Sequence, residues 1–475
     1  MRSLLRRREE SNDRHRVGRK PLYYMPMRDR LTRFSLAAGA QVPDATAMAV
    51  ILLLVLIAAA LGLGNSFTAT SDAFYRGLWM LLAFSMQITL LLLLSSVLSA
   101  MPFFRTAIVR LATLPASTTQ VFLLSVLVTS SLSYVYWGLG LALGPLIGVH
   151  FARAAEARGI RVDFPCLLAT QFAATSIWQY GLSSTPALLV ATPGHFLQDT
   201  TGVMPLGTTI WAPASILFAV TFPILLALLA RLMAPREPRP ISAYPDANAL
   251  TQVAETVAAE PGGSRGLGAW SERTRLFTLT LAAVVGVWLY HHFVTLGAGL
   301  ELNSMITMLL FVVLLLLPNL TALSQGLRLG VQCCWPILVL YQVYGGVAGV
   351  LQYTNVGESL ARFFADISTP MTFPLVTAIA GTVVAIFVPS SGGQWIIQGF
   401  VTSHAASTLG VSAQQGLLAL GIGDQMGNLI SPFWIVVAAS IARVNFRTIF
   451  GYGLVFAVLW FVLGVGIFTL MPVIA

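Results

Sequence analysis

The stretch Phe387-Val-Pro-Ser-Ser-Gly-Gly-Gln-Trp395 interrupts an apolar segment that runs over residues 372–410. Proline removes a backbone donor, the two glycines loosen the chain, and serine and glutamine bring polar atoms into an apolar run. In a bilayer, a break of this kind survives only where it is buried in protein or lines a wet cavity. The stretch therefore predicts a re-entrant hairpin, which turns inside the membrane instead of crossing it.

The composition of the chain supports a membrane environment for this segment. Of the 475 residues, 56% are hydrophobic and 9% are charged, whereas soluble domains carry about 25% charged residues. The apolar runs are too long and too numerous for a soluble core. No metal-binding, thiol-redox or phosphate-loop motif is present, which argues against an enzyme and against a primary pump. We therefore expect an all-α polytopic membrane protein.

The positive charge is concentrated at the N-terminus. Residues 1–33 hold 11 of the 27 basic residues and four acidic ones, so they carry +7 of the net charge of +9. Ahead of a membrane span, such a tail fixes orientation or contacts anionic lipid of the bilayer. We expect a cytoplasmic tail over residues 1–45 and no nucleic-acid partner.

Three further apolar segments are interrupted by polar or flexible residues. Gly423–Pro432 forms a second strong polar break. Weaker breaks in the first half of the chain centre near Tyr134 and Ser183. The four interrupted segments are 118–152, 164–196, 372–410 and 413–442. Because discontinuous helices mark binding sites in secondary transporters, this pattern favours a transporter.

The arginines decide how these segments cross the membrane. Arg105 and Arg110 precede segment 118–152, and Arg158 follows it. Both ends of this segment can be cytoplasmic only if it is a hairpin that enters and leaves on one side. The loop 197–209 has no Lys or Arg and lies on the opposite side. Continuing along the chain predicts nine crossings, two hairpins, a cytoplasmic N-terminus and an external C-terminus.

This order predicts an inverted-topology repeat with two re-entrant hairpins and two discontinuous helices. Each repeat holds two spans, a hairpin (118–152 or 372–410), a broken helix (164–196 or 413–442) and a last span. The expected units are a tail over 1–45, a first membrane repeat over 46–233, a cytoplasmic linker over 234–275, a connecting span over 276–296 and a second membrane repeat over 303–472.

The breaks are the expected site. Free N–H groups at half-helix N-termini suit an anion, and free carbonyls at C-termini suit a cation. Hydroxyl and amide side chains add neutral partners, so a carboxylate could be held without an arginine. The candidate substrate ligands are Ser183, Ser184, Thr185, Ser390, Ser391, Gly392, Gly393, Gln394 and Asn428. The simpler interpretation is that these residues only kink or pack helices.

Asp424 is the only acidic residue inside a predicted span. An intramembrane carboxylate is costly and is usually functional. With Gln425 and Ser431 as neighbours, it could ligate Na⁺, carry H⁺ or cap a half-helix. We favour a proton as the coupling ion, because no second acid accompanies Asp424. No other cofactor and no bound metal are expected.

At these residues the chain resembles the short-chain fatty acid transporter family, within a wider ion-transporter superfamily. The motifs that carry the resemblance are Leu81–Gln87, Trp137–Gly140, Ala191–His195, Pro389–Trp395 with Gln398-Gly399, and Gly423–Gln425 with Asn428 and Pro432–Trp434. The chain departs from the family pattern at Tyr136, where Asn is common, and at Ser391 and Gly427, where Gly and Thr are usual.

The resemblance implies import of short monocarboxylates, such as acetoacetate or butyrate, by cation symport in the bacterial inner membrane. It also implies a homodimer with an elevator-type mechanism, in which a scaffold supports a moving transport domain. Trp137 and Gly138 join the candidate substrate ligands on this basis.

Two alternatives remain open from the sequence. One is a dicarboxylate or other organic-anion carrier of the same superfamily. The other is a membrane enzyme, or a receptor that binds its ligand without translocating it.

Overall fold

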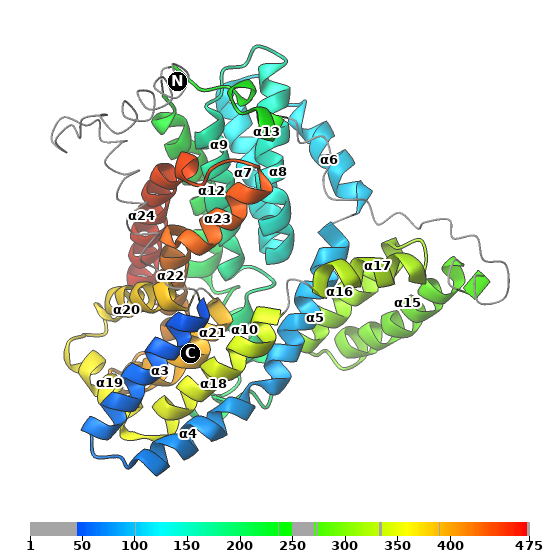
Figure 1. The fold of residues 1–475 in the computed structure, drawn as a ribbon. Helices are drawn as coiled ribbons and strands as arrows, with labels where there is room; N and C mark the ends of the chain where they lie inside the picture. Colours follow the sequence, from blue (N-terminus) through cyan, green and yellow to red (C-terminus); the bar gives the residue numbers. More distant parts are fainter. Residues whose placement is uncertain are drawn as a thin grey trace, which may run out of the picture. The chain divides into compact units, whose positions relative to one another are not determined.

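A computed structural model describes residues 45–99, 101–235, 237–248, 270–271, 274–331, 335–388 and 390–472. These residues form helices joined by turns and loops, and they contain no strand (Figure 1). Within these residues, six helices are long and apolar enough to cross a membrane: 67–99, 118–135, 137–156, 213–233, 275–295 and 447–470. The prediction of an all-α polytopic membrane protein is therefore confirmed. Most of the expected basic tail, the middle of the expected linker and Pro389 lie outside the described residues.

The helices of the first half follow one another with few connecting residues. They are α3 (Ala45–Gly62), α4 (Phe67–Met80), α5 (Leu82–Ser99), α6 (Pro102–Ala112), α7 (Thr118–Val135), α8 (Trp137–Glu156), α9 (Phe164–Thr175), the 3₁₀ turn η2 (Ser176–Tyr180), α10 (Thr185–Ala191) and α12 (Pro213–Met233). Side-chain oxygens cap the N-termini of several of these helices: Ser66 caps α4, Ser117 caps α7 and Asp163 caps α9. These caps satisfy backbone donors that a helix start leaves unpaired.

The second half contains a similar series. Its helices are α15 (Arg275–Tyr290), α16 (Leu302–Leu316), α17 (Leu320–Val331), α18 (Trp335–Tyr353), α19 (Asn355–Asp366), α20 (Phe373–Phe387), α21 (Ser391–Thr408), α22 (Ala413–Ile430), α23 (Pro432–Ile441) and α24 (Arg447–Leu470). The expected span over 303–324 ends earlier than predicted, at Leu316. Pro318 cannot continue the backbone ladder, and Asn319 accepts a bond from the Ala322 amide at 2.9 Å, which starts α17.

Two of the predicted breaks lie elsewhere than expected. Gly423–Asn428 is not a break, because α22 continues as a helix to Ile430 and is interrupted only at Ser431. Gly423 instead serves packing: a Cβ there would lie 2.1 Å from the Ala378 carbonyl of α20. Likewise, residues 129–134 are helical, and the chain is extended at Tyr136, between α7 and α8. Glycine and serine inside an apolar run can therefore mark close helix contact as well as a break.

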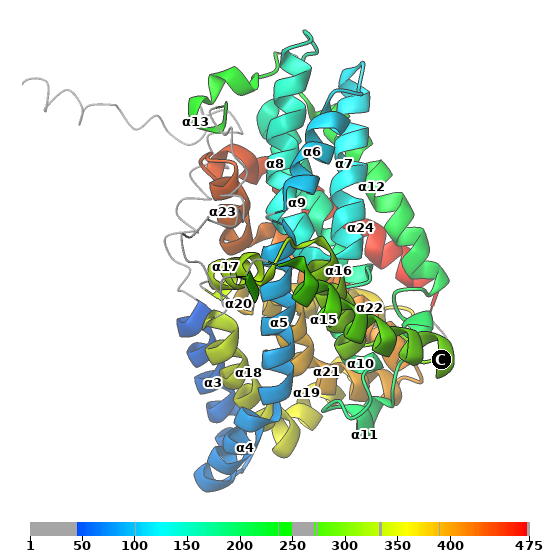
Figure 2. The ribbon, with the colours of Figure 1, turned by 90° about the vertical axis from the view of Figure 1, so that its right-hand side faces the viewer.

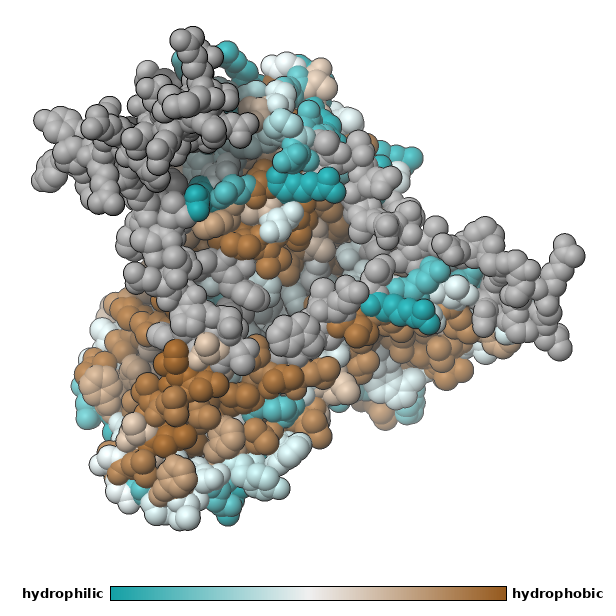
Figure 3. Space-filling view, in the orientation of Figure 1, coloured by the Kyte–Doolittle hydropathy of each residue, from teal (hydrophilic) through white to brown (hydrophobic). Residues whose placement is uncertain are grey.

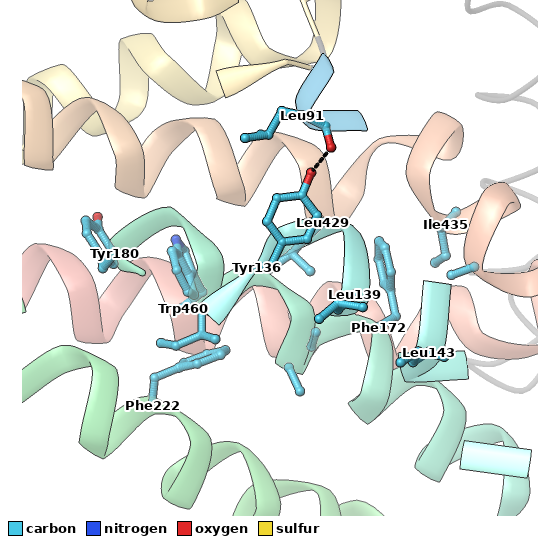
Figure 4. Close-up of a cluster of buried hydrophobic side chains, with 14 of the residues drawn as sticks. Leu91, Tyr136, Leu139, Leu143, Phe172, Tyr180, Phe222, Leu429, Ile435 and Trp460 are labelled. Carbon is cyan, nitrogen blue, oxygen red and sulfur yellow. Dashed lines mark hydrogen bonds between the residues drawn. The ribbon is translucent and has the colours of Figure 1, made fainter. Parts of the chain in front are cut away.

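Two groups of helices are built on close contacts. In the first, α18 packs against α3 and α4 (Figures 1 and 2). Gly77 of α4 has no room for a Cβ, which would lie 2.2 Å from the Gly345 carbonyl of α18. In the second group, α9, α12, α22 and α24 enclose an aromatic core, in which Tyr180 stacks on Trp460 with ring centroids 5.7 Å apart (Figure 4).

Large apolar side chains cover the outer faces of several helices. Leu54 and Val55 of α3 are 60% and 58% exposed, and Val287 of α15 is 71% exposed. Figure 3 shows hydrophobic side chains gathered over the α3 and α18 region and over α15 and α16. Since apolar area of this extent is unfavourable in water, these faces suit the hydrocarbon of a bilayer.

The described part of the linker is bonded to the helix ends near it. Asp163, which is fully buried, forms an ion pair with Arg239 at 3.0 Å and also accepts the Arg239 backbone amide at 3.1 Å. The Ser242 amide donates to Glu156 at the end of α8. Residues 237–248 are thus fastened to α8 and α9.

Candidate functional site

The polar centre of the molecule surrounds Asp424, in the middle of α22. Its side chain is 0% exposed, and its Oδ2 accepts from Gln425 Nε2 at 2.9 Å and from Asn428 Nδ2 at 3.1 Å. Asp424 takes part in none of the ion pairs formed among the described residues. Two side-chain amides therefore hold Oδ2 of this buried carboxylate.

The start of α21 lies beside this carboxylate. Ser391 donates its hydroxyl to Gln179 Oε1 at 2.7 Å and also lies close enough to Asp424 to interact with it. Ser390 caps the helix by accepting from the Gly393 amide at 3.4 Å, and its hydroxyl pairs with that of Tyr341 at 2.8 Å. The positive end of the α21 dipole is therefore directed at the polar centre.

Gln394, one turn into α21, joins the two limbs of the second hairpin. Its Nε2 donates to the Gly381 carbonyl of α20 at 2.7 Å and to Gln398 Oε1 at 2.7 Å. Gly381 in turn packs next to Gly423, the neighbour of Asp424 in sequence. Gln394 is 0% exposed, so its amide is part of the interior of the site.

Three buried oxygen atoms of this cluster have no hydrogen-bond partner among the described residues. They are Asp424 Oδ1, Asn428 Oδ1 and Gln394 Oε1. The orientation of both amides is fixed, because each nitrogen donates to a carbonyl or carboxylate oxygen. Buried acceptors are normally paired, and leaving one unpaired costs about 1–3 kcal/mol. This group of acceptors can therefore receive a cation or a proton donor.

The first-half break meets the first hairpin. Ser183 Oγ accepts from the Trp137 amide at 2.8 Å, and the Leu182 amide donates to the Tyr134 carbonyl at 2.7 Å. Gly181 permits this contact, since a Cβ there would lie 2.4 Å from that carbonyl. The tip of the first hairpin is thus bonded to the break that precedes α10.

The N-termini of α10 and α21 come together. A Cβ built on Gly392 would lie 3.5 Å from Cβ of Thr185, the first residue of α10. Ser184 and Thr185 are buried, as are Ser391 and Gly392. The structure therefore brings the predicted residues of the second hairpin and of the first-half break to one place.

Other predicted residues lie at the border of this site. Gly138 packs against Ser95 of α5, and Trp137 is half-buried with its ring 6.2 Å from that of Trp178. Gly393 lies against the Tyr344 ring of α18. Ser431 is the C-terminal cap of α22, just beyond Asn428.

Two residues were missed by the sequence analysis. Gln179, in η2, accepts from both Ser391 and Gln425, the latter at 3.3 Å. Its position two residues before Gly181 was the available signal. Tyr341 of α18 had no such signal, because an aromatic residue in an apolar span is ordinary.

An aromatic surface adjoins the polar centre. Phe84 of α5 stacks on Tyr341 with ring centroids 5.8 Å apart, and a Cβ on Gly392 would lie 3.1 Å from the Phe84 ring. Tyr344 lies next to Tyr341, with centroids 6.2 Å apart. Polar groups on α21 and α22 thus face apolar ones on α5 and α18, an arrangement that suits a small amphipathic ligand.

Comparison with known proteins agrees with this geometry. Residues 27–471 match the family described as short chain fatty acid transporter. A relative from Escherichia coli that is named for this transport is 28% identical over 400 residues, which cover 82% of this chain and 88% of the relative. One from Haemophilus influenzae, named in the same way, is 26% identical over 457 residues, covering 92% and 99%.

The fold is shared with a solved transporter. The crystal structure of the Alcanivorax borkumensis YdaH transporter aligns with a TM-score of 0.50 and 14% identity, over 90% of this chain and 98% of that one. At this identity the likeness concerns the fold alone. Because the family match spans nearly the whole chain, this protein belongs to the short-chain fatty acid transporter family, whose members are transporters and not enzymes.

Proposed function

We propose that the protein imports short-chain monocarboxylates, such as acetoacetate or butyrate, together with a coupling cation. The observation that carries this proposal is the pairing of Asp424, a buried carboxylate outside every ion pair of the described residues, with the positive N-terminus of α21. One group suits a cation and the other suits an anion, and both lie in the same polar cluster.

The substrate carboxylate would bind where the starts of α10 and α21 meet. The backbone N–H group of Gly392 and hydroxyl groups at Ser390 and Thr185 supply donors without a fixed positive charge. The remaining predicted ligands Ser183, Ser184, Ser391, Gln394, Asn428, Trp137 and Gly138 surround or support this point. The short acyl chain would lie toward Phe84 and Tyr344, which adjoin Gly392 and Gly393.

The coupling cation would neutralise Asp424. Ionising a buried carboxylate that has no basic partner costs several kcal/mol. Binding a cation at Asp424 removes this cost. We propose a proton, which needs a single acceptor such as Asp424 Oδ1. Na⁺ is the alternative ion, because it could use Asp424, Asn428 and Gln394 oxygens together, with Gln425 and Ser431 next to them in α22.

The proposed architecture is an inverted repeat. Its support is the order of the elements: a helix pair, an interrupted helical segment and a last span end each half, from α7 to α12 and from α20 to α24. The ends of the first pair, α7 and α8, also meet, since Arg158 donates to the Thr113 and Pro115 carbonyls at 2.6 Å each.

The same order suggests how the protein works in its membrane. We place it in the bacterial inner membrane with the N-terminus in the cytoplasm, as a homodimer. In an elevator mechanism, α3–α5 and α16–α18 would form the scaffold, and the two hairpins and broken helices would move with the substrate. Residues 234–275 would link the repeats on the cytoplasmic side.

Reconstitution in proteoliposomes tests the proposal. Labelled butyrate, acetoacetate and succinate are offered with an inward proton gradient, an inward Na⁺ gradient or neither. We expect accumulation of the two monocarboxylates with the proton gradient. Accumulation of succinate alone, or of no substrate under any gradient, would contradict the proposal.

A further inference from the structure

The hydroxyl of Ser391 has two acceptors within reach. One is Gln179 Oε1 at 2.7 Å, and the other is the Asp424 carboxylate. A serine hydroxyl carries one proton, so it can donate to only one of them at a time. In this structure the proton goes to Gln179, while Oδ1 of Asp424 has no partner among the described residues.

We propose that Ser391 is a relay that donates to Asp424 when this carboxylate is ionised, and to Gln179 when the coupling cation has neutralised it. An ionised carboxylate makes hydrogen bonds about twice as strong as those of a neutral group. The Ser391 hydroxyl therefore donates its hydrogen bond to Asp424 when this carboxylate is ionised, and to Gln179 Oε1 when Asp424 is neutral. This inference rests on the proposed coupling at Asp424.

Gln179 is held in position for this role. It is 4% exposed, and a Cβ on Gly421 would lie 2.6 Å from its Nε2, so only glycine at 421 leaves space for it. Its Oε1 also accepts from Gln425 Nε2 at 3.3 Å, and the same nitrogen donates to Asp424. Contacts within η2 and α22 thus fix the position of Gln179, and this position does not depend on the second hairpin.

The relay connects ion binding to the second hairpin. Ser391 is the first residue of α21, so its bond attaches the hairpin either to Asp424 on α22 or to Gln179 on η2. The titratable groups facing Asp424 from other elements are Tyr180 and Tyr341, and both hydroxyls are already bonded, to the Leu418 carbonyl and to Ser390. Binding of the coupling cation at Asp424 would therefore act on the second hairpin through the hydrogen bond of Ser391.

Two substitutions should shift the cation dependence in opposite directions. Gln179→Met has similar length but no acceptor, so Ser391 loses its partner in the cation-bound state and cation binding weakens. Half-maximal uptake should then need about tenfold more of the coupling cation. Ser391→Ala removes the donor to ionised Asp424, so half-maximal uptake should need less cation. Ser391→Thr, which keeps the hydroxyl, should retain the parental dependence.

Gln171→Met is the matched control, because Gln171 is buried in α9 and bonds Thr129 at 2.6 Å and Ser125 at 3.0 Å, away from Asp424. It should reduce stability without moving the cation dependence. Initial uptake by proteoliposomes is measured against external pH and against NaCl. Shifts of the Gln179 and Ser391 variants in the same direction, or no shift, would overturn the relay. A parent protein that accumulates no substrate under any gradient would overturn the proposed function itself.

Discussion

Asp424 is the residue on which gradient-driven transport should depend. Asp424→Asn keeps the shape and can still bond Gln425 and Asn428, but it cannot be ionised or carry a proton. We expect the variant to lose accumulation of substrate against a gradient. The rate at which it exchanges internal for external substrate should stay within about threefold of the parent's, which corresponds to less than about 1 kcal/mol.

Asp72→Asn is a suitable control for that experiment, because Asp72 lies in an exposed pair with Arg76. It should accumulate substrate like the parent protein. If Asp424→Asn also accumulates substrate normally, Asp424 only shapes α22 and the coupling ion binds elsewhere.

His195 should make stability depend on pH. Burial lowers the pKa of this imidazole below its ordinary value of 6.5, partly opposed by its bond to the Gly202 carbonyl. Its other nitrogen accepts from the Leu197 amide at 3.3 Å, which a protonated ring cannot do. Below about pH 6.5 the unfolded chain binds more protons than the folded one, so stability falls as the pH falls.

The measurement is the apparent melting temperature of purified protein at several pH values from about 7.5 to 5. His195→Phe keeps the ring but has no titratable group, so its melting temperature should fall less over this range than that of the parent. Equal slopes for the two proteins would show that the pKa of His195 is the same in the folded and the unfolded chain.

At the level of residues, the sequence predicted which polar side chains lie inside the protein better than it predicted their contacts. Ser391, Gln394 and Asp424 stand out because polar groups in an apolar segment are costly unless they are used. Tyr341 does not stand out, and Gln179 is marked only by its place two residues before Gly181, because their partners lie more than 40 residues away along the chain. Long-range pairing of this kind is a property of the packing and has no local signal.

The contact between α20 and α22 depends on glycine. Gly423→Ala would place a methyl group 2.1 Å from the Ala378 carbonyl, so the helices must separate. We expect a loss of about 1–3 kcal/mol in stability, together with impaired transport, because Asp424 and Gln394 lie at this contact. Thermal melting monitored by size-exclusion chromatography in detergent measures the first effect.

Gly466→Ala provides the comparison, because a Cβ at this position of α24 meets nothing within 4 Å. Alanine is the better helix former by roughly 0.5–1 kcal/mol, so this variant should be at least as stable as the parent. Equal melting temperatures for the two variants would mean that α20 and α22 are not packed this closely.

At the level of elements, helix type was predictable and the exact position of the breaks was not. The break before Ser391 contains proline, which forces an interruption. The segment Gly423–Asn428 has glycine and polar residues without proline, and it remains helical because its backbone bonds are all available. Segment 164–196 was expected to break near Ser183, and the structure has a separate helix, Thr185–Ala191, directly after that point.

The topology of the whole molecule rests on the first hairpin. The open ends of α7 and α8 meet, because Thr118 donates to the Arg161 carbonyl at 2.8 Å and Arg158 bonds the carbonyls of residues 112, 113 and 115. Its tip is bonded to the break before α10. Since α10 has seven residues, about 10 Å of helix, the tip and the loop that follows α10 lie at different levels.

Single-cysteine labelling in intact cells tests this arrangement. In a protein without Cys166, Cys333 and Cys334, cysteines replace Arg110, Ala157 and Thr200 one at a time, all of which are exposed. A membrane-impermeant maleimide should react with position 200 from outside, and with positions 110 and 157 only after the cells are opened. Labelling of 110 and 157 from opposite sides would require an odd number of crossings between them. The first hairpin would then cross the membrane, and the proposed inverted repeat would be wrong.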